Sequence, residues 1–184
     1  MGLDILLGAN NQAELDAGDY NPNDHSLSRN FCNFMYRRSA IEEEPELDQI
    51  GRLTGIDISP LYEMENYILP EDLKSMLEHA DDEAERQEII EQNNAAAAAM
   101  SGNIDRVLTT VESLLTQLAT IADLPSRLLP DEYDTLHSTA YFANFAATKM
   151  NAYDNTFGQD LRNMKSFLLY AKSKGSETVF FVYG

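Results

Sequence analysis

The sequence predicts a mostly α-helical protein of the α+β class: a helical bundle around a central helix at 103–123, with a small sheet that pairs the N- and C-terminal strands. Three observations support this prediction. Apolar side chains recur at spacings of three and four through the central segment. Other segments combine similar spacings with helix start and stop signals. Residues 178–183 are rich in β-branched and aromatic side chains, and such a strand needs a partner, for which residues 3–6 are the best candidate.

The central helix is expected to begin at Asn103, whose side chain can cap the first turn. It is expected to end near Asp123, because Pro125 disfavours helical geometry at the preceding residue. At about 1.5 Å per residue, a helix of this length spans roughly 30 Å, so other elements can pack along all of it. Its apolar positions are Ile104, Val107, Leu108, Val111, Leu114, Leu115, Leu118, Ile121 and Ala122.

The N-terminal part of the chain contains a long polar stretch and then two helices. Residues 12–23 are expected to form a loop, which we consider a candidate wall of a site. A helix is expected from a cap at Asp24 or Ser26 to about residue 38, with its apolar stripe in the core. Pro45 fits the first turn of the next helix, and Gly55 is expected to end it.

Pro60 and Pro70 each occupy the first position of a further predicted helix. The second of these is expected to run to about Asn93 with a thin apolar stripe, and helix is expected to resume in the alanine run 95–99. We expect the long helix to fold back against the central helix at 103–123 as a helical hairpin.

Two helices are expected after the central one. Residues 131–150 are aromatic-rich, and residues 159–174 are amphipathic and followed by Gly175 at the position of a helix stop. Three aromatic side chains of the first segment are expected in the core: Tyr141, Phe142 and Phe145.

The length of 184 residues predicts a single domain, 1–184, that needs no metal or disulfide to fold. The lone cysteine, Cys32, cannot form an intramolecular disulfide and is expected as a buried reduced thiol. The sequence has neither a signal peptide nor a stretch long enough to span a bilayer, so a cytoplasmic location is expected.

The net charge is -18, and most of it lies in one segment. Residues 40–92 contain 17 acidic residues against Arg52, Lys74 and Arg86. A polyanionic surface repels nucleic acid and anionic membranes, so neither is an expected direct partner, and a basic protein is. The simplest alternative is that these charges only keep the protein soluble.

No catalytic signature is present, so the sequence favours a non-enzymatic protein. The three histidines, His25, His79 and His137, do not form a zinc-binding pair on a helix, and Asp134 with His137 would supply only two ligands. The sequence also lacks a nucleophile elbow and a phosphate-binding glycine loop. We therefore expect no cofactor and no metal.

The leading functional hypothesis is an acidic interaction protein that binds and inhibits a basic partner, as immunity proteins, antitoxins and inhibitors do. Nucleic-acid mimicry is a special case of this hypothesis. The acidic segment would steer association, and two tyrosines would anchor the complex. The expected partner-binding residues are Glu42, Glu43, Glu44, Glu46, Asp48, Tyr62, Tyr67, Glu78, Asp81, Asp82 and Glu85.

The alternative hypothesis is an anion-binding or nucleotide-binding protein, or a hydrolase, that uses the helix start at 24–30. His25 would act as general base and Arg29 would hold an anion beside the free amides of the first turn. A third possibility is a structural subunit that assembles through residues 131–150. The sequence does not specify the oligomeric state. The residues of the alternative site are Asp24, His25, Ser26, Ser28, Arg29 and Asn33.

Overall fold

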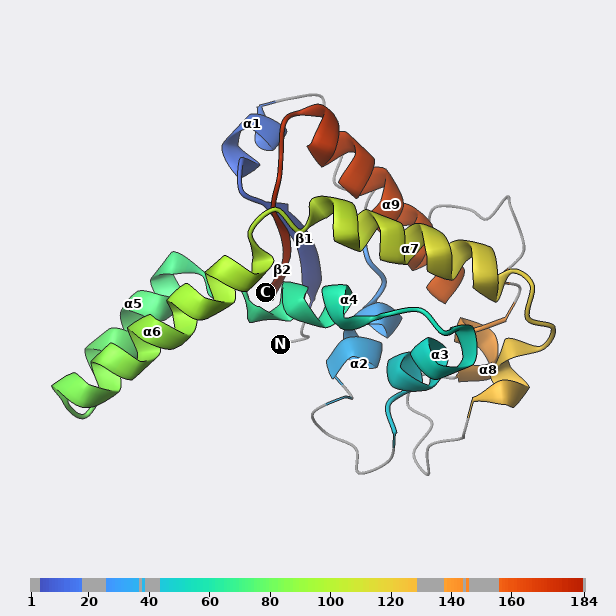
Figure 1. Cartoon of the computed structure of the whole chain (residues 1–184), viewed down its shortest axis with the longest axis horizontal. Coiled ribbons are helices and arrows are strands. Elements are labelled where there is room, and N and C mark those ends of the chain that lie inside the picture. Colours follow the sequence, from blue (N-terminus) through green and yellow to red (C-terminus); the bar gives the residue numbers. More distant parts are fainter. Residues whose placement is uncertain are drawn as a thin grey trace.

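The computed structural model describes residues 4–17, 26–36, 38, 44–128, 138–143, 145 and 156–183. It shows a body of helices gathered on a two-stranded ribbon, from which a pair of helices projects to one side (Figure 1). The predicted fold class is confirmed: the protein is mostly helical and its small sheet pairs the two ends of the chain.

The ribbon consists of β1 (Ile5–Ala9) and β2 (Val179–Tyr183), paired antiparallel. Ile5 lies opposite Tyr183, and Ala9 lies opposite Val179. β1 begins and ends later than predicted, because the backbone pairing continues through Gly8 and Ala9 beyond the apolar run that identified the strand. Residues 1–3 lie outside the described part of the chain.

The central helix α7 (Ile104–Leu118) packs along α9 (Phe157–Ser173), and the inner faces of both are buried in the core. The predicted end near Asp123 is wrong. The helix stops at Leu118, where the hydrogen bonds tighten and Thr120 donates both its N–H (3.0 Å) and its hydroxyl (2.7 Å) to the carbonyl of Gln117. The 3₁₀ turn η4 (Leu124–Arg127) follows.

The short helices α2 (Arg29–Tyr36), α3 (Glu46–Thr54), α4 (Ser59–Glu63) and α8 (Ser138–Tyr141) complete the body, with the 3₁₀ turn η3 (Met64–Asn66) after α4. Pro60 and Pro70 lie in the first turns of α4 and α5 as predicted, although α4 begins one residue earlier, at Ser59. The predicted stop at Gly55, which has φ +70°, is confirmed. The predicted helix at 131–150 falls mostly outside the described residues.

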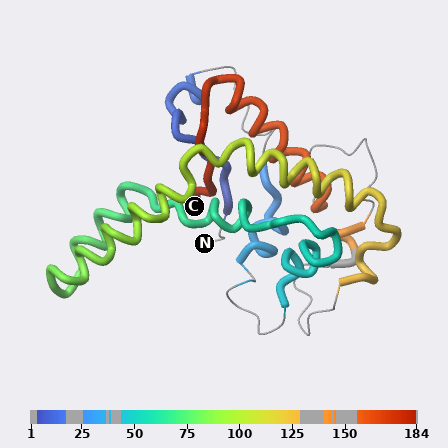
Figure 2. Tube along the Cα trace, in the orientation of Figure 1, coloured from blue at the N-terminus to red at the C-terminus, as the bar shows by residue number. Residues whose placement is uncertain are grey.

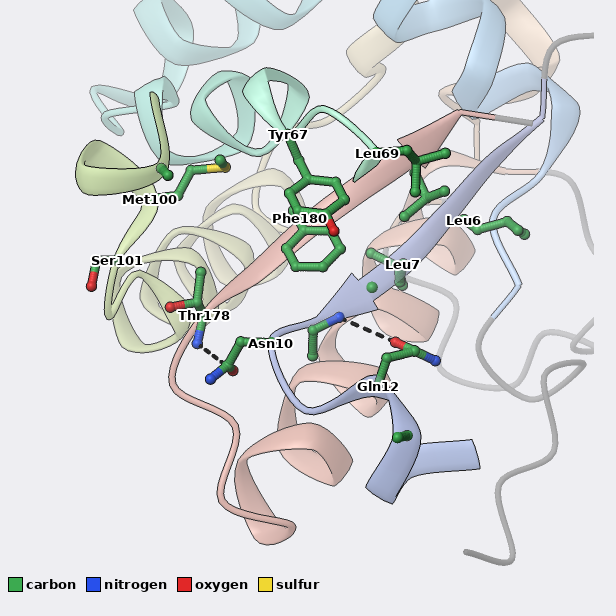
Figure 3. Close-up of a pocket in the computed structure, with 15 residues that line it drawn as sticks. Leu6, Leu7, Asn10, Gln12, Tyr67, Leu69, Met100, Ser101, Thr178 and Phe180 are labelled. Atoms are coloured by element: carbon green, nitrogen blue, oxygen red, sulfur yellow. Dashed lines mark hydrogen bonds between the residues drawn. The ribbon is translucent and has the colours of Figure 1, made fainter. Parts of the chain in front are cut away.

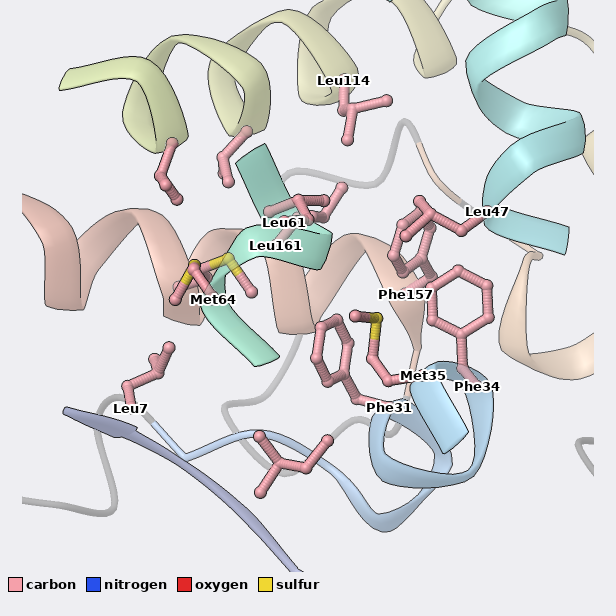
Figure 4. Close-up of a cluster of buried hydrophobic side chains, with 14 of the residues drawn as sticks. Leu7, Phe31, Phe34, Met35, Leu47, Leu61, Met64, Leu114, Phe157 and Leu161 are labelled. Atoms are coloured by element: carbon pink, nitrogen blue, oxygen red, sulfur yellow. The ribbon is translucent and has the colours of Figure 1, made fainter. Parts of the chain in front are cut away.

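Aromatic side chains fill one end of the core (Figure 4). The ring of Phe34 lies 5.0 Å from that of Phe157 and 5.7 Å from that of Phe142, centroid to centroid. Tyr141, Phe142 and Phe145 are all buried, as predicted. These contacts join α2 to residues more than a hundred positions later in the sequence, so this end of the core closes only when the two parts of the chain meet.

The polar stretch after β1 is not entirely a loop. Residues 12–16 form the short helix α1 (Gln12–Asp16), because Asn11 accepts the first helical hydrogen bonds and Leu15 is fully buried. The rest of the predicted loop, residues 18–23, lies outside the described part of the chain.

The predicted helix from Pro70 to Asn93 is two helices, α5 (Pro70–His79) and α6 (Glu83–Met100). The chain reverses between them because the Asp82 carboxylate accepts the N–H of Glu85 (2.9 Å) and caps α6. The side chain of Glu85 in turn accepts the N–H of Asp81 (2.6 Å). The helical hairpin is therefore α5 with α6, and it does not fold back along α7 (Figure 1).

Asn103 precedes α7 as predicted, but its side chain does not cap the helix. It is fully buried and binds the edge of β2: its Nδ2 donates to the carbonyl of Val179 (2.9 Å), and its Oδ1 accepts the N–H of the same residue (2.8 Å). These two bonds occupy groups with which a third strand would otherwise pair. One side chain thus fastens the central helix to the ribbon.

Replacing Asn103 with Ala should destabilise the protein by about 2–5 kcal/mol, because the buried backbone N–H and carbonyl of Val179 both lose their hydrogen-bond partner. Chemical denaturation followed by circular dichroism would measure the loss. Asn94→Ala, at an exposed site on α6, is the matched control and should change the free energy of unfolding by less than about 0.5 kcal/mol. Equal stability of the two variants would contradict this role of Asn103.

Candidate functional site

The projecting hairpin, residues 70–100, is the most exposed part of the described structure, and we call it the acidic arm (Figure 2). Met100, at its base, is its only buried residue. It contains nine acidic residues against Lys74 and Arg86. Its helices are therefore surrounded by solvent over most of their length and present a negatively charged surface.

Local interactions support the arm without a core. α6 contains five consecutive alanines, which have the highest intrinsic helix propensity. Two side-chain hydrogen bonds at i,i+4 spacing also stabilise α6: Gln87 donates to Glu91 and Gln92 donates to Glu88, both at 2.9 Å. Of the larger apolar side chains, Met76 and Ile90 are 43% and 38% exposed. The arm is stable enough to form yet leaves apolar side chains accessible.

The predicted partner-binding residues on the arm lie together near its tip. Glu78 is at the end of α5, Asp81 and Asp82 form the turn, and Glu85 is in the first turn of α6. All four are exposed, and the only nearby cation that pairs with one of them in the described structure is Lys74, 3.7 Å from Glu78.

The predicted residues on the body lie in a different environment. Glu44 pairs with Arg52 (2.7 Å), and this hydrogen bond lowers the pKa of the Glu44 carboxyl. Glu46 is buried, and Asp48 is half-buried beside Tyr62. These acids are therefore not presented to a partner as those of the arm are. Glu42 and Glu43 lie outside the described residues.

The two predicted anchor tyrosines are both packed within the protein. The guanidinium of Arg38 lies 3.7 Å above the ring centroid of Tyr62. Tyr67 is stacked on Phe180 of β2, with ring centroids 3.6 Å apart and ring planes inclined by 11°. Tyr67 is half-buried and remains reachable from one side.

A groove with a volume of about 700 Å³ lies where the arm joins the ribbon (Figure 3). Its lining comes from β1, α1, the segment before α5, the end of α6 and β2. Most of the lining is apolar, including Leu6, Leu69, Met100, Phe180 and Tyr67. This groove was not predicted from the sequence, although the strands that line it are apolar on both faces, which is a signal that both faces are covered.

The alternative site, at the start of α2, is occupied by the chain itself. The carboxylate of Asp160 accepts the N–H (2.8 Å) and the hydroxyl (2.7 Å) of Ser28, and also the hydroxyl of Tyr141 (2.9 Å). The backbone carbonyl of Ser26 accepts the side-chain amide of Asn163 (2.7 Å). An internal carboxylate thus takes the place where the sequence analysis expected an external anion.

The other residues of that site do not converge on one point. Arg29 is exposed and pairs with Asp4 (3.2 Å), and Asn33 is exposed on α2. Asp24 and His25 lie outside the described residues. The anion hypothesis stays a prediction, and a thermal shift by inorganic phosphate that Arg29→Ala abolishes would support it.

Asp160 is the one strongly perturbed acid of this network. Its burial raises the pKa of the carboxyl to about 6, although the hydrogen bonds from Ser28 and Tyr141 work in the opposite direction. The sequence does not predict this burial, because an acid in the first turn of an amphipathic helix normally faces solvent and complements the helix dipole. It is buried because Ser28, which precedes α2, and Tyr141 of α8 pack against it in the folded protein.

The described residues show neither a reactive thiol nor a metal site. Cys32 is buried, its sulfur accepts the N–H of Ile5 (3.0 Å), and burial raises the pKa of its thiol, so little of the nucleophilic thiolate is present at neutral pH. In the described ranges, no three His, Cys, Asp or Glu side chains gather where they could bind a metal ion. None of the helices described here is both long and apolar enough to cross a membrane.

Comparisons with protein-family models, with curated protein sequences and with solved structures find no match to this chain.

In the variant Asp160→Asn, the free energy of unfolding should depend less on pH than it does in the wild type. In the unfolded chain an aspartate has a pKa near 3.9, so between about pH 4 and pH 6 the folded protein binds the proton more strongly. Acidification therefore stabilises the wild type through this residue, by up to roughly 3 kcal/mol for a shift of about two pKa units.

Chemical denaturation of both proteins at several values between pH 4 and pH 7 would test this, since the other titrating groups cancel in the difference. The free energy of unfolding of the wild type should rise relative to that of Asp160→Asn as the pH falls from 7. Parallel curves for the two proteins would show that the buried carboxyl does not titrate in this range.

Proposed function

We propose that this protein is a non-enzymatic interaction protein whose acidic arm binds a basic protein partner and masks the partner's basic surface. The observation that supports this proposal is that residues 70–100 form two ordered helices with only Met100 buried. Such a hairpin contributes little to the core, so its shape and charge are not explained by the stability of the body.

The charge of the arm favours a basic partner. Most acids of the body segment at 44–69 have partners within the chain, including Glu44 with Arg52 and Glu63 with Arg106 (2.8 Å). The acids at the tip of the arm are exposed, and this surface produces a negative potential that steers a cationic protein toward it. Because these charges are in water, salt should screen their attraction strongly.

Neutralising two acids at the arm tip, Glu78→Gln with Asp81→Asn, should slow association with the partner roughly tenfold at low salt. The matched control, Glu112→Gln with Asp123→Asn, changes the net charge equally on the body, away from the arm. The first measurement is affinity capture from an extract of the source cells at low salt, with elution by salt and identification by mass spectrometry. Association rates of the purified partner with each variant then follow.

The expected result is a basic protein that the wild type and the body control retain, and that the arm variant retains poorly. Displacement of that protein by duplex DNA would identify the nucleic-acid mimic among the possible inhibitors. A partner that both double variants bind with equal, salt-independent association rates would contradict the proposed role of the arm.

A further inference from the structure

Both strands of the ribbon are apolar at almost every position. Helices cover the inner face, whereas the outer face is covered only in part, because Phe180 is buried beneath Tyr67 and Leu6 is exposed. On the inner face, Ile5, Ala9, Val179 and Phe181 are at most 2% exposed. On the outer face, Leu6 is 57% exposed and borders the groove. A strand with one face in water normally alternates apolar and polar side chains. The apolar composition of the outer face is therefore typical of a surface that a binding partner covers.

The wall of the groove is built by a close stack of side chains (Figure 3). A Cβ at Gly8 would lie 2.5 Å from the ring of Phe180, so only glycine lets this ring lie flat across β1. Tyr67 then stacks on the far side of the same ring. This arrangement keeps both rings in fixed positions, so the groove is formed before anything enters it.

Two polar side chains of the groove, Asn10 and Gln12, are already engaged within the protein. The Asn10 Oδ1 accepts the N–H groups of Glu177 and Thr178, both at 3.1 Å. The Gln12 Oε1 accepts the N–H of Ala9 (3.2 Å). These groups hold the walls together, and what the groove offers an occupant is mainly apolar contact.

Every formal charge close to the groove in sequence is negative. No lysine or arginine lies within two positions of any lining residue. Five acidic residues do: Asp4, Glu14, Glu65, Glu71 and Glu177. Two of them are paired within the chain, Asp4 with Arg29 and Glu65 with Arg38. The guanidinium of Arg106, which pairs with Glu63, also donates to the carbonyl of Ala99 (3.1 Å) beside the groove. Glu14, Glu71 and Glu177 are exposed, and the acidic arm extends this potential away from the groove. The occupant that complements the site has apolar side chains flanked by positive charge.

We propose that the groove binds the apolar side of a cationic amphipathic segment of the partner that the arm attracts. This inference rests on the proposed function and specifies the partner's binding element. A volume of about 700 Å³ suffices for a few large side chains. A second copy of this chain fits less well, because each copy carries a net charge of -18 and would repel the other.

A synthetic amphipathic peptide of lysine and leucine with one tryptophan is the probe for this proposal. The protein contains no tryptophan, so tryptophan fluorescence reports the peptide alone. A scrambled peptide of identical composition has the same charge without an apolar face. Two protein variants are matched: Ala97→Phe fills the groove, whereas Ala98→Phe is adjacent, is also exposed on α6 and does not line the groove.

The amphipathic peptide should bind the wild type and Ala98→Phe with a blue shift of its emission, and should bind Ala97→Phe roughly tenfold or more weakly. The scrambled peptide should bind all three weakly and equally. Equal binding of the amphipathic peptide to the two phenylalanine variants would overturn the groove proposal. A wild-type dimer that dissociates in Ala97→Phe would also overturn it and would assign the groove to self-association.

The arm variant Glu78→Gln with Asp81→Asn separates the two proposals. This variant should bind both peptides more weakly than the wild type does at low salt, while the blue shift of the bound amphipathic peptide stays unchanged. If arm neutralisation affects neither peptide and Ala97→Phe still weakens the amphipathic one, the groove proposal stands and the steering role of the arm fails. Equal melting temperatures of the two phenylalanine variants would confirm that the comparison is between folded proteins.

Discussion

The antiparallel pairing of the two ends of the chain is the constraint on which the other contacts depend. β1 and β2 pair from Ile5 with Tyr183 to Ala9 with Val179, and the inner face of this ribbon contributes to the core. Phe181 packs edge-on against Phe31 of α2, with centroids 5.8 Å apart. Because α9 leads directly into β2, the pairing also places α9 beside α7 and closes the aromatic end of the core.

The same ribbon separates the core from the groove. Its inner face is committed to the fold, and its outer face opens into the groove at the base of the acidic arm. The arm leaves the body there because Gly102, with φ +68°, turns the chain sharply between α6 and the buried Asn103. Charge on the arm and apolar surface at its base are thereby adjacent, which is the combination that attracts a cationic partner and then retains it.

Two places in the molecule suit a ligand by their chemistry. The first is filled by a side chain of the protein itself, and the second is partly open to solvent. At the start of α2, Asp160 supplies a carboxylate from within the chain and binds Ser28 and Tyr141. This network is satisfied internally and serves to join α2, α8 and α9. In the groove, the side-chain oxygens of Asn10 and Gln12 also have partners within the chain, but part of the apolar wall, including Leu6, is exposed. Only the second place has surface left for a partner.

The sequence by itself determined the features that are encoded locally: the helix starts at Pro60 and Pro70, the stop at Gly55, the apolar face of the central helix and the strand at 178–183. The break at Asp82 was also encoded locally, by a cap that the apolar periodicity concealed. Only the tertiary structure decided the burial of Asp160, the direction of the arm and the groove. The burial of Asp160 and the groove arise where segments over a hundred residues apart meet, and the direction of the arm depends on the bonds between Asn103 and Val179. A one-dimensional pattern contains no information on which surfaces will face each other.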